Sequence, residues 1–149
     1  TVGDTVILAQ SLTTKDATGT PTIESVTVTP IAANGDYELA TALTLNTNAV
    51  DIVILSGGNE TDANLANDFA DENGDELYKY IAANNVTTAA INVDNDGDEF
   101  YIIAYDGGEA FLYHADSDAN SEIAAANIKP LIHFDSQVGT FVAEDFSLV

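Results

Sequence analysis

Apolar residues occur in short runs that recur about every ten residues, with Gly, Asn, Asp and Pro between them, as in the strands and turns of all-β domains. Within residues 25–29 valine alternates with Ser or Thr, so that Val26 and Val28 share one face of a half-buried strand. The pattern predicts strands at residues 2–10, 23–29, 37–45, 50–55, 88–93, 99–105, 110–114, 129–134 and 140–142.

The middle of the chain has a different pattern. Residues 59–85 lack β-branched runs and are rich in Ala, Leu, Asp and Glu, which favours helix. Asn59 or Thr61 can cap a helix that runs through Phe69, and Asp75 can cap a second helix. We therefore expect one or two short helices between about residues 59 and 85.

Turn signals join several of the apolar runs. Asn34-Gly35-Asp36, Asp96-Gly97 and Asp106-Gly107-Gly108 are each typical of a hairpin with a short loop. Antiparallel pairing is favoured over residues 99–114. The predicted fold class is mainly β, with sandwich- or roll-like antiparallel sheets, and the length fits a single domain over residues 1–149.

The charge balance excludes two classes of partner. The chain has 25 Asp and Glu against three lysines and no arginine, for a formal net charge of −22. Binding to nucleic acid and to anionic membranes depends on clustered basic residues, so neither is expected. The longest uninterrupted apolar stretch, residues 100–105, is far shorter than the roughly 20 residues that span a bilayer, and we predict no membrane insertion.

Three loops place side-chain oxygens at alternate positions: DENGDE, DNDGDE and DSDANSE. Such spacing can direct several carboxylate and amide oxygens to one point about 2.3 to 2.6 Å away, as calcium requires. Calcium is therefore the predicted cofactor. The candidate ligands are Asp71, Asn73, Asp75, Asp94, Asp96, Asp98, Asp116, Asp118, Asn120 and Glu122.

These loops do not fit an EF-hand. The twelfth positions counted from Asp71, Asp94 and Asp116 hold no carboxylate to close such a loop, so calcium binding in a β-loop is the expected form. The alternative is that Asp, Asn and Gly cluster because they form turns and keep the surface hydrated. The occurrence of three such loops favours at least one real site.

Other chemistry is weakly indicated. His114 and His133 stand alone on apolar strands, so a zinc site would need ligands distant in sequence. No catalytic motif with a nucleophile and an adjacent base is present, and we do not predict an enzyme. The aromatic residues of the strands are typical of core and cross-strand pairs; an exposed aromatic face would instead favour sugar binding.

Part of the chain resembles a known family. The segments are SGGNETDANLANDFADENGDEL, with a single degenerate glycine–aspartate repeat, EFYIIAYDGGEAFLYHADSD, and the acid-then-hydrophobic final residues 144–149. They are similar to the C-terminal regions of repeats-in-toxin and related S-layer or adhesin proteins of type I secretion. Glu60 stands where the repeat has its third glycine, so a regular calcium β-roll is not expected. The resemblance implies bacterial export of an unfolded chain and calcium-assisted folding outside the cell.

Three functions follow as hypotheses. The first is a secreted, calcium-stabilised structural protein of the cell surface or extracellular matrix, self-assembling through strand edges into a layer or filament. The alternative is a carbohydrate- or surface-binding adhesin module with a surface glycan as partner. A third, an extracellular hydrolase, requires an acid with a raised pKa in an apolar cleft. The acidity also fits a salt-rich habitat.

Overall fold

Strands dominate the structure. The computed structural model describes residues 6–8, 23–27, 29–30, 37–38, 43–45, 52–56, 65, 69–70, 74–82, 91–93, 99–106, 108–116, 123–135 and 141–148. The strands in these parts of the chain are β1 (Val6–Leu8), β2 (Ile23–Thr27), β3 (Thr29–Pro30), β4 (Tyr37–Glu38), β5 (Leu43–Leu45), β6 (Ile52–Ser56), β7 (Ile91–Val93), β8 (Glu99–Asp106), β9 (Glu109–Asp116), β10 (Ile128–Phe134) and β11 (Phe146–Leu148). The same parts of the chain contain the helix α2 (Asp75–Ala82) and the 3-10 turns η2 (Ala125–Asn127) and η3 (Ala143–Asp145), and Leu65, Phe69 and Ala70 are also helical. The mainly-β prediction is confirmed.

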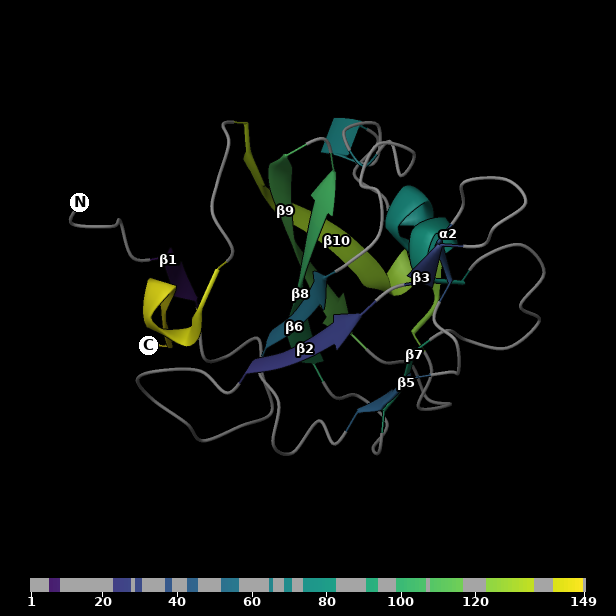
Figure 1. The fold of residues 1–149 in the computed structure, drawn as a ribbon, viewed down its shortest axis with the longest axis horizontal. Helices are drawn as coiled ribbons and strands as arrows, with labels where there is room; N and C mark the ends of the chain where they lie inside the picture. The colour runs from purple at the N-terminus through teal and green to yellow at the C-terminus, as the bar shows by residue number, and fades with distance from the viewer. Residues whose placement is uncertain are drawn as a thin grey trace.

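The central feature is a five-stranded mixed sheet in the order β10-β9-β8-β6-β2 (Figure 1). Strands β8 and β9 pair antiparallel, as predicted, and β9 also pairs antiparallel with β10. Strands β2, β6 and β8 pair in parallel, which was not predicted. The connection from β6 to β8 contains α2, and a crossover of this kind returns the chain in the same direction. Further strands form the pairs β1–β11, β3–β4 and β5–β7.

The β8–β9 hairpin confirms the turn predicted at Asp106-Gly107-Gly108. Its register pairs Asp106 with Glu109 beside the turn and Glu99 with Asp116 at the far end. Gly108 has φ 86°, a backbone conformation that residues with a side chain rarely adopt. The turn predicted at Asp96-Gly97 lies outside the described residues; before it, β7 pairs in parallel with β5.

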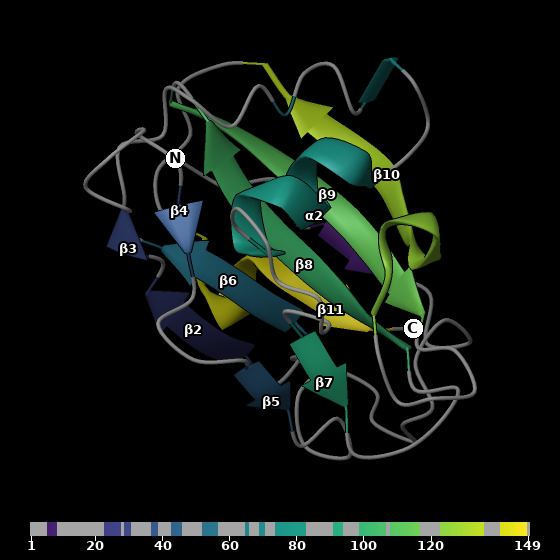
Figure 2. The same cartoon turned by 90° about the vertical axis from the view of Figure 1, so that its right-hand side faces the viewer.

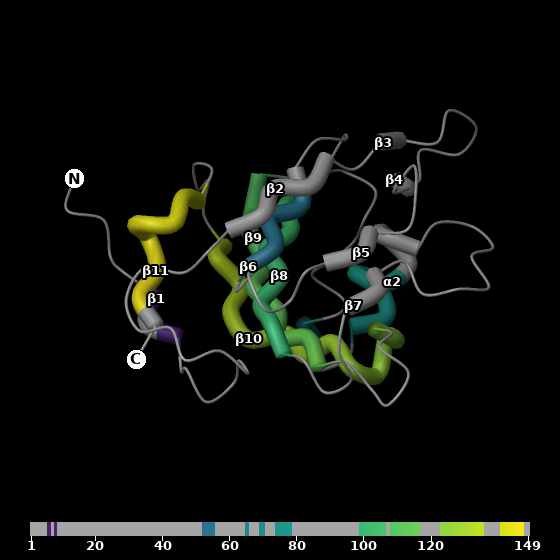
Figure 3. Tube along the Cα trace, turned by 90° about the horizontal axis from the view of Figure 1, so that it is seen from below, coloured from purple at the N-terminus to yellow at the C-terminus, as the bar shows by residue number. Residues whose placement is uncertain are grey.

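The sheet is covered on both faces. On one face, side chains from β6, β8 and β9 pack against Leu65, Leu77 of α2, and Ile123. On the other, Ile52, Tyr101 and their neighbours on the same face of the sheet pack against β1 and β11. Figure 2 shows α2 lying across the sheet, and Figure 3 places β1 and β11 on the opposite side from α2. Burial on both faces explains why β6 and the middle of β8 are continuously apolar rather than alternating.

Helix α2 begins at Asp75, as the sequence predicts. Asp75 and Glu76 lie in its first turn, where negative charge is favourable. The preceding Gly74 is buried, and its carbonyl accepts a hydrogen bond from the Tyr78 amide at 2.8 Å. A Cβ on Gly74 would lie 2.7 Å from Cγ2 of Ile128, so glycine permits the close approach of the start of α2 to β10.

The end of the chain differs from its prediction. Residues 141–142 are not part of a strand, although the backbone of Val142 is extended, and they lead into the 3-10 turn η3 and then β11. The Asp145 carboxylate accepts a hydrogen bond from the Val142 amide at 2.9 Å, which favours the turn over a strand at this point. Within the described residues, no helix has the length and apolar character needed to cross a bilayer.

Candidate functional site

Two of the ten predicted calcium ligands are described. Asp75 is the first residue of α2 and Asp116 is the last residue of β9, and both are exposed. The described part of the chain contains no group of three or more His, Cys, Asp or Glu placed to hold a metal. The other candidates, which lie outside the described residues, are Asp71, Asn73, Asp94, Asp96, Asp98, Asp118, Asn120 and Glu122.

The structure does show how the three predicted calcium loops are anchored. The loop at residues 94–98 leads into β8 and the loop at 116–122 leaves β9, and Glu99 and Asp116 are paired across these strands. The loop at residues 71–75 leads into α2, where Gly74 contacts Ile128. Ile128 in turn pairs with Ala115, next to Asp116. One described flank of each loop, Gly74, Glu99 or Asp116, therefore lies at the same end of the sheet.

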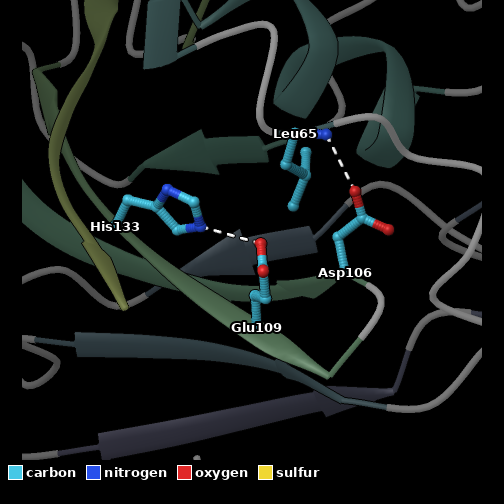
Figure 4. A network of polar contacts seen from close by, with 4 residues as sticks. All are labelled: Leu65, Asp106, Glu109 and His133. Carbon is cyan, nitrogen blue, oxygen red and sulfur yellow. Dashed lines mark hydrogen bonds and ion pairs between the residues drawn. The ribbon is translucent and has the colours of Figure 1, made fainter. Parts of the chain in front are cut away.

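A polar cluster lies at the other end of the hairpin, beside the β8–β9 turn (Figure 4). His133 Nε2 of β10 lies 2.8 Å from Glu109 Oε2 of β9. The His133 ring stacks on Phe111, its cross-strand partner, with centroids 4.4 Å apart and planes 13° apart. The ring of Phe69 lies 5.6 Å from His133. The imidazole is thus oriented by two phenyl rings and one carboxylate.

Asp106 belongs to the same cluster. Its Oδ2 accepts a hydrogen bond of 3.0 Å from the amide of Leu65, a helical residue far away in sequence. Asp106 and Glu109 are cross-strand partners of like charge, an arrangement that destabilises a hairpin unless each carboxylate has a donor. The Leu65 amide is the donor to Asp106, and His133 is the donor to Glu109. The cluster therefore joins the segment at Leu65 and strand β10 to the β8–β9 turn.

A second histidine–glutamate pair lies near the end of the hairpin opposite its turn, next to the predicted calcium loops at residues 94–98 and 116–122. His114 Nε2 is 3.3 Å from Glu99 Oε2, and the Tyr101 ring meets the imidazole edge-on at 5.9 Å. Tyr101 is buried in the core on the β1–β11 side. Burial, together with the nearby Glu99 carboxylate, raises the pKa of Tyr101 to about 12.

Both pairs connect neighbouring strands. The side chains of His133 and Glu109 are 28% and 40% exposed, so the contact is partly hydrated and contributes on the order of 0–1 kcal/mol to stability. An imidazole beside a carboxylate can also move a proton. In the described part of the chain, however, His133 is surrounded by Phe69, Phe111 and Glu109, a setting that favours strand pairing over substrate chemistry.

The sequence interpretation of the histidines missed both glutamate partners. The signal was present in the predicted hairpin, because a turn at residues 106–108 sets Tyr101 opposite His114 and leaves Glu99 diagonally adjacent on the same face. The Glu109–His133 pair had no such signal. It depends on the irregular register between Pro130 and Ile132 of β10, which only the folded sheet shows.

The aromatic residues bear on sugar binding. Phe100, Tyr101, Phe111 and Tyr113 are fully buried, and Tyr105 is partly buried. A carbohydrate-binding platform needs rings that face solvent. These residues form the core of the sheet, as the sequence favoured, and strands β8, β9 and β10 carry no exposed aromatic residue.

Comparison with known proteins identified no related protein. No protein-family model matches the chain, and no curated protein or solved structure matches it significantly. The resemblance to type I secreted surface proteins remains a prediction from the residues quoted above.

Proposed function

We propose that this chain is a secreted, calcium-stabilised structural protein of the bacterial cell surface or extracellular matrix that assembles into a layer or filament. One observation supports it most directly: one described flank of each of three carboxylate-rich loops, distant in sequence, lies at the same end of the sheet. Loops anchored this close together can contribute oxygens to shared or adjacent calcium sites.

The electrostatics of the sheet support the same proposal. All four carboxylates of β8 and β9 lie at strand ends, as the like-charge pairs Glu99–Asp116 and Asp106–Glu109. The turn pair has His133 and the Leu65 amide as donors. At the opposite end of the hairpin, His114 is near Glu99, and the predicted calcium loops that adjoin this end add further carboxylates. A divalent cation at that end would relieve this repulsion.

Calcium would also couple folding to location. At a net charge of −22, repulsion among carboxylates opposes the compact state, and an ion that binds only the folded chain stabilises it. Type I export of an unfolded chain into a calcium-rich medium fits this dependence. The proposed site of action is therefore outside the cell.

The test is thermal unfolding combined with light scattering, first in chelator and then in millimolar calcium. Magnesium and sodium chloride at matched ionic strength are the controls. We expect calcium to raise the melting temperature well above both controls and to drive growth into ordered assemblies. An equal response to all three salts, with a particle that stays monomeric, would overturn the proposal.

A further inference from the structure

The first and last described strands form a small unit of their own. Strand β1 pairs in parallel with β11, with Val6 opposite Phe146, Ile7 opposite Ser147 and Leu8 opposite Leu148. The pair is three residues long, and a two-stranded parallel pairing of this length adds little stability by itself. What holds β1 is mainly the burial of its side chains.

Strand β11 is held in place without β1. The ring of Phe141 lies 5.0 Å from that of Phe134 in β10 and 5.3 Å from that of Phe146 in β11. The Phe141 amide donates a hydrogen bond of 2.9 Å to the Tyr105 hydroxyl of β8. These contacts fasten the segment before β11, and β11 itself, to the central sheet. Strand β11 is therefore suited to act as a fixed acceptor.

Strand β1 completes a site that the rest of the molecule forms. Leu8 is 4% exposed and packs in the cluster that contains Ile52 of β6, Ile103 of β8 and Phe146. Without β1, the place of Leu8 in this core and one edge of β11 would both be open. The segment that fits this site is known from the structure, and the β1 of a second copy is identical to it.

The number of residues between β1 and β2 is large enough for β1 to reach a neighbouring copy. Residues 9–22 join β1 to β2, and an extended chain of that length reaches on the order of 45 Å. Neither β1 nor β11 contains a charged residue, so copies of a chain with net charge −22 can join here without burying a carboxylate within either strand. By contrast, the outer edge of β10 carries Lys129, Pro130 and a register irregularity, which are features that discourage strand addition.

We propose that β1 of one copy pairs with β11 of the next, replacing the β1 of that copy. Donor and acceptor are different surfaces, so the contact is head-to-tail and can continue as an open filament. The inference rests on the self-assembly in the proposed function and specifies its contact. The sequence predicted assembly through strand edges in general; this proposal names the edge of β11 as the acceptor and β1 of a second copy as the strand that binds it.

A disulfide lock tests the exchange. The chain has no cysteine, so the double variant Ile7→Cys with Ser147→Cys has a single possible pair, at positions that face each other in the register. Neighbouring strands lie about 4.8 Å apart, within the range that a disulfide spans. Oxidation at high dilution is expected to close the bond within one copy. A monomer that migrates faster on a non-reducing gel would confirm this.

The locked protein is then placed in calcium and followed by light scattering. We expect no assembly while the bond is closed and full assembly after reduction, with Ile7→Cys alone assembling throughout as the control. If the locked copies assemble as well as the reduced ones, the exchange is overturned while the proposed function stands. If the single variant and the unmodified chain also fail to assemble, self-assembly itself is overturned.

Mixing experiments give an independent readout. Equal amounts of Ile7→Cys and Ser147→Cys are oxidised together in calcium, and a disulfide-linked heterodimer is expected. The control replaces Ser147→Cys with Val142→Cys, since Val142 is 50% exposed but is not a partner of β1. Equal heterodimer yields in the two mixtures would mean random collision and would contradict the exchange.

Discussion

Tyr101 shows how the fold changes the chemistry of a single residue. Its ring is buried beneath β1 and β11, and its pKa is raised to about 12 by burial and by the Glu99 carboxylate. In the unfolded chain a tyrosine has a pKa near 10. The folded state therefore holds this proton more tightly than the unfolded state does.

The consequence is a loss of stability at alkaline pH. Because the folded pKa is the higher one, the contribution of Tyr101 is complete below about pH 10 and is lost as the pH rises towards about 12. We expect Tyr101→Phe to unfold with a smaller alkaline decrease than the unmodified chain. Urea denaturation at about pH 8 and about pH 11 measures this, and equal decreases in both proteins would contradict it.

His133 is predicted to act through its ring more than through its charge. His133→Ala removes the stack on Phe111 and the contact with Phe69, and a loss of about 1–2 kcal/mol in the free energy of unfolding is expected. His133→Phe keeps a ring and loses the contact with Glu109, and should cost about 1 kcal/mol or less. Chemical denaturation of the two variants distinguishes the roles. Equal losses for the two variants would show that the Glu109 contact, which both remove, dominates over the ring contacts.

At the scale of elements, local patterns were reliable where neighbouring residues decide the structure. The start of α2 at Asp75 and the β8–β9 turn both follow from short signals, a capping acid and an Asp-Gly-Gly sequence. The pairing of β7 with β5 and of β6 with β2 did not follow, because partners in a parallel sheet are distant in sequence. Of the strand predicted at residues 140–142, the described residues 141–142 are not in a strand, and the Asp145 side chain favours the 3-10 turn that follows them.

The junction of α2 with β10 gives a prediction at this scale. In Gly74→Ala the new methyl group would lie 2.7 Å from Ile128 Cγ2 and 2.9 Å from the Ala125 carbonyl oxygen, closer than packed atoms allow. We expect a loss of about 1–3 kcal/mol in the free energy of unfolding. Ala126→Ser, at an exposed position nearby, is the control and should change stability by less than about 0.5 kcal/mol. Urea unfolding compares them, and equal stabilities would mean that the helix can shift away from β10.

For the whole molecule, the question is whether calcium acts at sites or by screening. Asp96→Asn with Asp98→Asn removes two charges from a predicted calcium loop. Asp135→Asn with Glu144→Gln removes the same charge from exposed positions outside the three loops. Screening depends on net charge and predicts the same calcium response in both variants, whereas site binding depends on particular oxygens.

We expect the loop variant to lose most of the calcium-induced rise in melting temperature and the control variant to keep it. In chelator, both should melt slightly above the unmodified chain because repulsion is reduced. Differential scanning calorimetry with and without calcium provides the comparison. A control variant that loses the response as fully as the loop variant would assign the effect to screening.

The sequence by itself determined the mainly-β class, the helix that starts at Asp75, the hairpin turn and the net charge of −22. These depend on neighbouring residues and on composition, and both are complete in the sequence. Only the tertiary structure decided which strands are parallel, that Glu109 meets His133, that one flank of each acidic loop lies at the same end of the sheet, and that β1 lies beside β11. Each of these joins residues far apart in the chain, and such contacts are selected by the packing of the whole core rather than by any local pattern.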